Sequence, residues 1–195
     1  MKVETVGEAR STACGTLSDE RFYHTECVVT AARELAVRFG EDTDRAMIAA
    51  YLHDIAKEMP SNDLLQMIEC SDIIDVDEIR QCRPVWHAYA GGIYATQQLG
   101  VDSGIGDAIS YHTTARAGMS NLEKIVFLAD CISRDRDFNG IDELRKCAQQ
   151  SLDEAMILAI QNQTVHLVRK RRHLDLNMIR AFNDLIEKTN TNPSI

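Results

Sequence analysis

Apolar residues recur at helical spacing along almost the whole chain, and glycine and proline stand between these segments rather than within them. No segment alternates apolar and polar residues as a half-buried strand does. Residues 1–17 show no clear pattern and are treated as a poorly defined N-terminal segment. The expected helices are near residues 18–40, 43–58, 61–70, 75–82, 84–99, 104–113, 120–130, 141–170 and 175–189. The sequence therefore predicts an all-α fold, with one helical domain over residues 18–189 and a tail over 190–195.

Several helix ends carry their own local signals. Ser18 is expected to cap the helix that stops near Gly40. Pro60 should end the helix before it, because a proline disfavours helical geometry in the preceding residue. Ser120 and Glu123 form the pattern of a capping box, in which each side chain bonds the other's backbone amide. These signals support the division of the chain into successive helices.

The overall charge excludes some classes of function. The chain has 195 residues, 45% of them hydrophobic, with a formal net charge of −9 and a pI near 5.1. Such a balance opposes a general nucleic-acid binder or a binder of anionic membranes. No apolar run approaches the roughly 20 residues of a membrane span, and no signal peptide is apparent. We therefore expect a cytoplasmic protein without a nucleic-acid or membrane partner, with a homodimer left open as an alternative to a monomer.

The six cysteines show no C-x-x-C pair and no regular spacing. Most fall within expected helices, which favours reduced, buried thiols over disulfides or a zinc–thiolate site.

The adjacent pair His53-Asp54 lies in an apolar segment, Ala49–Lys57, that is expected to be a buried helix. A buried carboxylate without a partner is very costly, and imidazole and carboxylate together suit zinc, iron or manganese. The other candidate ligands are His24, His87, His112 and Asp130, each on its own expected helix. The pattern predicts a metal site.

The six candidates divide naturally between two metals. His24, His53, Asp54 and Asp130 would hold one ion, while His87, His112 and a bridging Asp54 would hold a second. Lys57, three residues after Asp54, would lie on the same helical face. The alternatives are histidines that are merely satisfied in the core and an Asp130 that forms an ion pair. The remaining two histidines, His166 and His173, are expected at the surface.

Five segments, taken together, resemble a known family. They are Arg21–Thr25, Leu52–Lys57, Trp86–Gly91, Ala108–Thr114 and Lys124–Asp130. The order of histidines and aspartates is similar to that of HD-domain metal-dependent phosphohydrolases. The full segments resemble, within that superfamily, the YqeK-type symmetrical bis(5′-nucleosyl)-tetraphosphatases, over about residues 18–150.

This resemblance implies an all-helical HD domain, a di-iron or similar dinuclear centre, and hydrolysis of diadenosine tetraphosphate to two ADP. A metal-activated hydroxide would attack an inner phosphate, with Asp54 and Lys57 as catalytic residues. The resemblance carries over the six ligands above, with Arg21 and Lys57 as phosphate contacts and Thr113 lining the pocket. Arg136 would complete a local positive cleft. Iron is favoured because thiolates are absent from the ligand set, with manganese or zinc as alternatives.

The sequence departs from the family pattern at two places. Ala115 stands where the family usually has glycine after His-Thr-Thr, and Ile132–Arg136 replaces a Glu-Pro-x-Arg stretch, keeping only the arginine. Both departures bear on the substrate end of the site. The basic run Arg169–Arg172 is interpreted as a solvated helix end, with anion binding as the alternative. Two other functions stay open: a different HD phosphohydrolase, such as a nucleotidase or phosphodiesterase, and a catalytically silent nucleotide-binding regulator.

Overall fold

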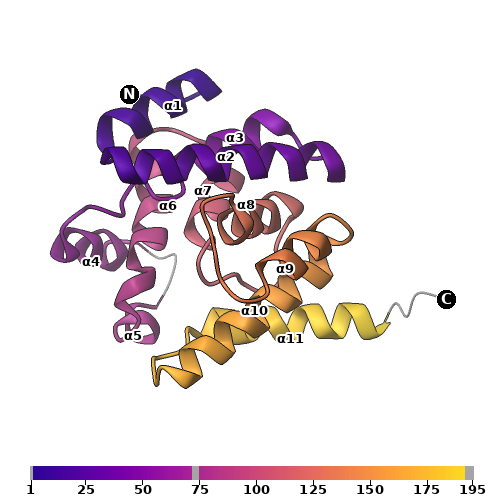
Figure 1. The fold of residues 1–195 in the computed structure, drawn as a ribbon. Coiled ribbons are helices and arrows are strands. Elements are labelled where there is room, and N and C mark those ends of the chain that lie inside the picture. Colours follow the sequence, from indigo (N-terminus) through magenta and orange to yellow (C-terminus); the bar gives the residue numbers. More distant parts are fainter. Residues whose placement is uncertain (1, 72–74, 192–195) are drawn as a thin grey trace.

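A computed structural model describes residues 2–71 and 75–191, and over these residues the chain is helical throughout, without strands (Figure 1). The elements are α1 (Val6–Thr16), α2 (Asp19–Phe39), α3 (Thr43–Leu52), α4 (Ser61–Glu69), α5 (Val76–Ile79), a 3-10 helix η1 (Arg83–Val85), α6 (Trp86–Gln98), α7 (Ser103–Ser110), α8 (Asn121–Ile132), α9 (Ile141–Ala148), α10 (Leu152–Arg169) and α11 (Leu176–Thr191). The predicted all-α fold is confirmed. No helix among these residues is long and apolar enough to cross a membrane.

Helix α8 runs through the middle of the molecule. Every residue from Leu122 to Ala129 is buried, which is the pattern of a helix covered on all sides. It packs against α2, α3, α7 and α10. Figure 1 shows α1 and α2 on one side of it and α10 and α11 on the opposite side. The C-terminal end of α8 is therefore held at the centre of the bundle.

Helices α6 and α7 approach each other through glycine. A Cβ atom built on Gly92 would lie 1.9 Å from the Oγ of Ser110 and 2.5 Å from the carbonyl oxygen of Gly106. Only a residue without a side chain fits at such a crossing. This contact brings the start of α6 and the end of α7 to the same end of the bundle, where His87 and His112 lie.

Two helices stop earlier than their apolar pattern predicted. The expected helix 43–58 ends at Leu52, and hydrogen-bonded turns follow, with the amide of Lys57 donating to the carbonyl of Asp54 over 2.8 Å. The expected helix 104–113 ends at Ser110. His53 is thus a C-terminal cap, and His112 lies in a turn. The apolar periodicity of a helix continues through such turns, because residues three apart in the turn still lie on the same side of the chain.

The N-terminal segment also differs from the expectation. Residues 6–16 form α1, whose start is a capping box between Thr5 and Glu8 that the sequence analysis overlooked. Ser18 has the backbone conformation of an N-cap, but its hydroxyl donates to Glu58 over 2.7 Å instead of capping the helix. The capping box of Ser120 with Glu123 is confirmed.

Smaller differences concern the other boundaries. The helix expected over 75–82 covers only Val76–Ile79, and Pro84 lies in the 3-10 helix η1 rather than in the first turn of α6. The stretch 141–170 divides into α9 and α10, and α11 continues to residue 191. The remainder of the expected tail, residues 192–195, lies outside the described residues. All six cysteines are free thiols. Cys27 and Cys82 are buried, Cys131 and Cys147 are half-buried, and Cys14 and Cys70 are exposed, so the expected burial holds for only some of them.

Candidate metal centre

The six predicted ligands converge at one place in the bundle. His24 comes from α2, His87 from α6 and Asp130 from the last turn of α8, while His53-Asp54 and His112 follow the ends of α3 and α7. The four imidazole rings form a row, with centroid distances of 5.5 Å from His24 to His53, 5.0 Å from His53 to His112 and 5.2 Å from His112 to His87. Residues from five different parts of the sequence thus share one buried cluster.

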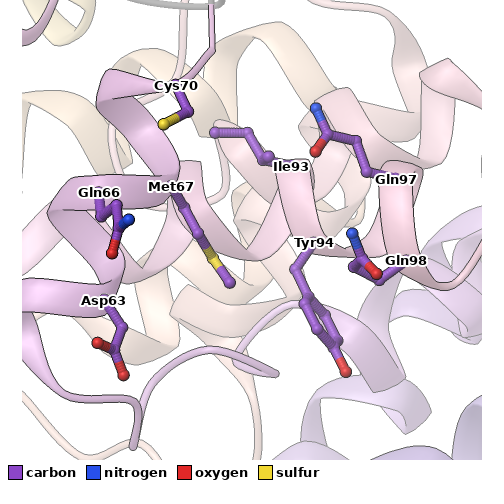
Figure 2. A pocket seen from close by; sticks show the side chains of 8 residues that line it. All are labelled: Asp63, Gln66, Met67, Cys70, Ile93, Tyr94, Gln97 and Gln98. Carbon is purple, nitrogen blue, oxygen red and sulfur yellow. The ribbon is translucent and has the colours of Figure 1, made fainter.

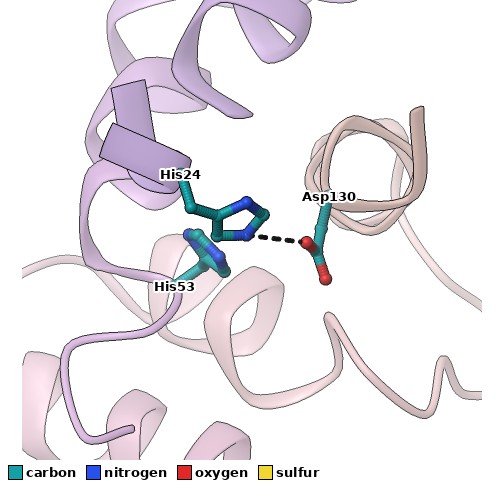
Figure 3. Close-up of side chains that lie close together, drawn as sticks. All are labelled: His24, His53 and Asp130. Carbon is teal, nitrogen blue, oxygen red and sulfur yellow. Dashed lines mark ion pairs between the residues drawn. The ribbon is translucent and has the colours of Figure 1, made fainter. Parts of the chain in front are cut away.

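Two overlapping triplets have ligand atoms within 4.8 Å of one another. The first is His24, His53 and Asp130, in which the His24 ring faces the Asp130 carboxylate across 3.0 Å (Figure 3). The second is His53, Asp54 and His112. His87 joins the second group through its Nε2, which lies 3.1 Å from the Oδ1 of Asp54. The cluster therefore has two ends, connected through His53 and Asp54.

Three of the rings are oriented by the backbone. His53, His87 and His112 each donate from Nδ1 to the carbonyl oxygen three residues earlier, over 2.7, 2.9 and 2.7 Å. Because a carbonyl can only accept, these bonds fix the tautomer and leave Nε2 with its lone pair toward the cluster. The ends of α3 and α7 place His53 and His112 where each ring reaches a carbonyl oxygen of the last helical turn.

The fourth ring has a different partner. The Nδ1 of His24 lies 2.7 Å from the Oδ2 of Asp135, a loop residue that the sequence analysis did not single out. A carboxylate behind a ligating imidazole is a common arrangement in metal sites, because it orients the ring and makes it more basic. A single aspartate in a loop carries no periodic or motif signal, so the sequence could not have identified it.

The centre of the cluster contains polar atoms that lack a hydrogen bond. The Nε2 atoms of His24, His53 and His112 and the Oδ1 of Asp54 are buried and make no hydrogen bond within the described residues. Buried polar atoms are rarely left in this state, because each one costs free energy. Imidazole nitrogens and carboxylate oxygens pointing at a common centre fit a divalent metal ion.

The electrostatics also suit a cation. Burial by itself would raise the pKa values of Asp54 and Asp130, but neighbouring histidines, with Lys57 beside Asp54 and Arg136 beside Asp130, hold both well below the usual range. Burial, together with the nearby His53 and His87, lowers the pKa of His112 to about 3. Metal ligands must be deprotonated. The carboxylates and this imidazole are already in that state near neutral pH.

Three basic residues surround the cluster, as predicted for a local positive cleft. The Nη1 of Arg21 lies 3.3 Å from the Oδ2 of Asp54. The Nζ of Lys57 lies 3.6 Å from the Oδ1 of Asp54 and donates to the Nε2 of His87 over 3.0 Å. Arg136 pairs with the carboxylate of Asp130. Although Lys57 is not in a helix, the turn keeps it on the side of Asp54, as expected.

A cavity of about 840 Å³ opens from the cluster between α8 and α10. His112, Asp130 and Arg136 are shared between the cluster and the wall of this cavity. Thr113, predicted to line the pocket, also lies there, and its buried hydroxyl makes no hydrogen bond to any residue that the structure describes. Another hollow, between α4 and α6, is smaller and is lined by Asp63, Met67 and Tyr94 among others (Figure 2). It shares no residue with the cluster.

The turn after His112 contains the first departure from the family pattern. Ala115 is fully buried and has a φ of 58°, in the left-handed region that favours glycine. The side chain of the next residue, Arg116, pairs with Glu123 over 2.6 Å and lies 4.5 Å from the ring of Tyr111. The backbone geometry thus suits the glycine that is usual in the family, and Ala115 adopts the left-handed conformation in its place.

Comparison with known proteins agrees with this geometry. The HD domain model matches residues 21–135. A crystal structure from Clostridium acetobutylicum, described as a predicted HD superfamily hydrolase involved in NAD metabolism, superposes with a TM-score of 0.90. It is 33% identical and covers 96% of this chain and 100% of its own. The fold and the histidine–aspartate cluster therefore define a protein of the HD superfamily of hydrolases.

Curated relatives narrow the assignment. A protein of Bacillus subtilis (strain 168) named "Bis(5′-nucleosyl)-tetraphosphatase, symmetrical" is 38% identical over 87% of this chain and 91% of its own length. One of the same name from Halalkalibacterium halodurans is 33% identical over the same shares of the two chains. The chain belongs to the HD domain family, in the group of the symmetrical bis(5′-nucleosyl)-tetraphosphatases.

Proposed function

We propose that this protein is a metal-dependent hydrolase that cleaves symmetrical dinucleoside polyphosphates, converting diadenosine tetraphosphate to two ADP. The observation that carries the proposal is the buried cluster in which four ligand atoms make no hydrogen bond within the described residues. It occurs in a chain whose relatives are named for this activity. A nucleotide substrate also accounts for basic residues placed around the cluster in an acidic protein.

The site is proposed to hold two metal ions, with iron favoured and manganese or zinc as alternatives. His24, His53, Asp54 and Asp130 would ligate one ion, and His87, His112 and Asp54 the other. Asp54 is suited to bridging because its Oδ1 faces His87 and His112 while its Oδ2 faces His53. Bound divalent ions of this kind lower the pKa of a water molecule and polarise the oxygens of the attacked phosphate.

The residues around the ions are assigned to the phosphates. Arg21 and Arg136 have side chains that are 38% and 41% exposed, so their guanidinium groups lie at the opening of the cluster. A guanidinium binds phosphate oxygens in pairs, and the positive charge stabilises the diphosphate that leaves. Thr113 offers its unpartnered hydroxyl from the cavity wall.

Lys57 is given a catalytic role, and its position constrains that role. The lone pair of His87 Nε2 accepts a hydrogen bond from Lys57 over 3.0 Å, so it can serve either the ammonium or a metal ion, but not both. When His87 ligates a metal, Lys57 must turn toward the substrate. An ammonium cannot ligate a cation, and it acts there as a point charge on the phosphates.

A second candidate function, that of a nucleotidase or phosphodiesterase, is favoured by one specific observation. The Clostridium acetobutylicum protein is described as involved in NAD metabolism. A single metal at His24, His53 and Asp130, with Lys57 retained on His87, would suit a nucleotidase or phosphodiesterase of that kind. We also expect a cytoplasmic location.

Metal analysis and product identification test the proposal together. The purified protein should contain close to two metal ions per chain and should release only ADP from diadenosine tetraphosphate. Asp54→Ala should lose both ions and the activity while keeping its helical circular dichroism. Release of AMP with ATP would refute symmetrical cleavage. Full metal occupancy in Asp54→Ala would refute the bridging carboxylate.

A further inference from the structure

The cavity beside the metal cluster has a wall that the proposed chemistry at the phosphates does not use. Seven residues of α10 line the cavity, among them those at positions 159, 162, 163, 166 and 169. Their spacing of three and four residues places them in one stripe along the helix. The stripe is about 15 Å long at 1.5 Å per residue. It therefore extends well beyond the ligand atoms of the cluster.

This stripe changes in character along its length. Ala159 is buried near α8, Asn162 and Gln163 are amides, and His166 and Arg169 are basic. A helix face that packs on a core would be apolar throughout. The side chain of Gln163 also holds the turn beside the cluster, since its Nε2 donates to the carbonyl oxygen of Thr113 over 3.3 Å. The stripe thus presents polar groups to the cavity. Through Gln163 it also contacts the turn that follows His112.

The opposite wall has an apolar section beside the polar groups Asp130, Arg136 and Asn139. Phe127 and Leu144 are buried in it, and Phe138, in the loop between α8 and α9, is 40% exposed. Among the other aromatic residues that the structure describes, only Tyr23 is exposed, at 55%, and the rest are buried or half-buried. The exposed ring of Phe138 beside a cavity is therefore unusual in this protein. A cavity of about 840 Å³ that combines an apolar section of wall with a few convergent polar groups has the features of a small-molecule site.

We infer that this cavity binds one nucleoside of the substrate, with the base stacked on Phe138 and its edge facing the amide of Asn162. Aromatic side chains stack on bases of any kind, and a side-chain amide can both donate to and accept from a base edge. The inference rests on the proposed function, because it takes the phosphates to lie at the cluster. It assigns Phe138 and Asn162 as residues that determine affinity for the nucleoside.

Binding of ADP and inorganic diphosphate to the metal-loaded full chain tests the assignment by calorimetry. ADP should bind more tightly than diphosphate to the wild type. Phe138→Ala should lower the affinity for ADP by about fivefold to 150-fold, the range of stacking losses on alanine substitution, and leave the affinity for diphosphate unchanged. Phe138→Tyr should retain the affinity. Ile179→Ala is the matched control, because Ile179 is similarly exposed, at 41%, but lies on α11.

A fluorescent reporter locates the base directly. The only native tryptophan, Trp86, is 6% exposed, so Phe138→Trp adds a distinguishable exposed indole. Its emission should change on addition of ADP and stay constant with diphosphate. An equal response to both ligands, no response, or an unchanged ADP affinity in Phe138→Ala would overturn the assignment.

The two proposals can fail separately. If wild-type protein releases no ADP from diadenosine tetraphosphate but the preference for ADP over diphosphate depends on Phe138, the proposed reaction is wrong and the nucleoside cavity stands. If ADP is released but no preference exists, the reaction stands and the cavity has another use.

Discussion

Asp135 is expected to control metal affinity although it is not a metal ligand. It accepts a hydrogen bond from the Nδ1 of His24 over 2.7 Å, and His24 is only 8% exposed. The other three rings of the cluster are held by backbone carbonyl oxygens, which a substitution cannot remove. Among the described residues, Asp135 is therefore the one side chain that holds the Nδ1 atom of a cluster histidine, and its effect can be measured by mutation.

The size of the effect follows from this geometry. Loss of a carboxylate behind a metal-ligating imidazole typically costs 10-fold to 100-fold in metal affinity, or about 1.4–2.7 kcal/mol. We expect Asp135→Ala to show the full loss. Asp135→Asn keeps an acceptor oxygen but not the charge, and a charge-assisted bond is about twice as strong as a neutral one. About half of the free energy should then be retained, so its loss should be about threefold to 10-fold.

Competition with a chelator measures these affinities. Each variant is loaded with manganese(II), and the metal remaining on the protein is followed as chelator is added. Asp137→Asn removes the same charge from the same exposed loop and should behave as wild type. Metal affinity should be highest in the wild type, lower in Asp135→Asn and lowest in Asp135→Ala, and this order is the informative result. A wild-type affinity in Asp135→Ala would show that His24 does not need this partner, and the reasoning would be refuted.

Two further predictions concern Lys57 and Ala115. Lys57→Ala should lower kcat about tenfold or more, with metal content unchanged, because the positive charge that stabilises the leaving diphosphate is lost. Lys146→Ala, at an exposed site, is the control. Loss of metal in Lys57→Ala would contradict the assignment of Lys57 to the substrate. Ala115→Val should destabilise the protein by about 2–4 kcal/mol, because a branched side chain is strained at a φ of 58° and this position is fully buried. Ala115→Gly should stay within about 1 kcal/mol of wild type in denaturant unfolding, since relief of about 1–2 kcal/mol of strain is offset by the lost methyl group and a freer unfolded chain. Equal stability of the valine and glycine variants would show that the turn is not strained.

Much of the protein follows from local sequence alone. Helical periodicity, Gly40 and the capping box at Ser120 predict a chain of helices because each signal acts within a few residues. The chemistry of His53-Asp54 likewise predicts a polar group that needs a partner in an apolar segment. The choice of all six candidate ligands required only their residue types and the apolar surroundings of each, supported by the family resemblance.

Tertiary structure decided where these groups meet and how they are oriented. The apolar pattern continues past Leu52 and Ser110, so periodicity could not reveal that α3 and α7 end there and supply carbonyl oxygens to His53 and His112. Asp135 contacts His24 across 111 residues of sequence. The cavity beside the cluster is lined by the turn after α7, by α8 and the loop after it, and by α9 and α10, which only packing brings together. Local preferences act over one or two turns of chain, whereas orientation at a site depends on contacts between distant segments, and packing alone determines those.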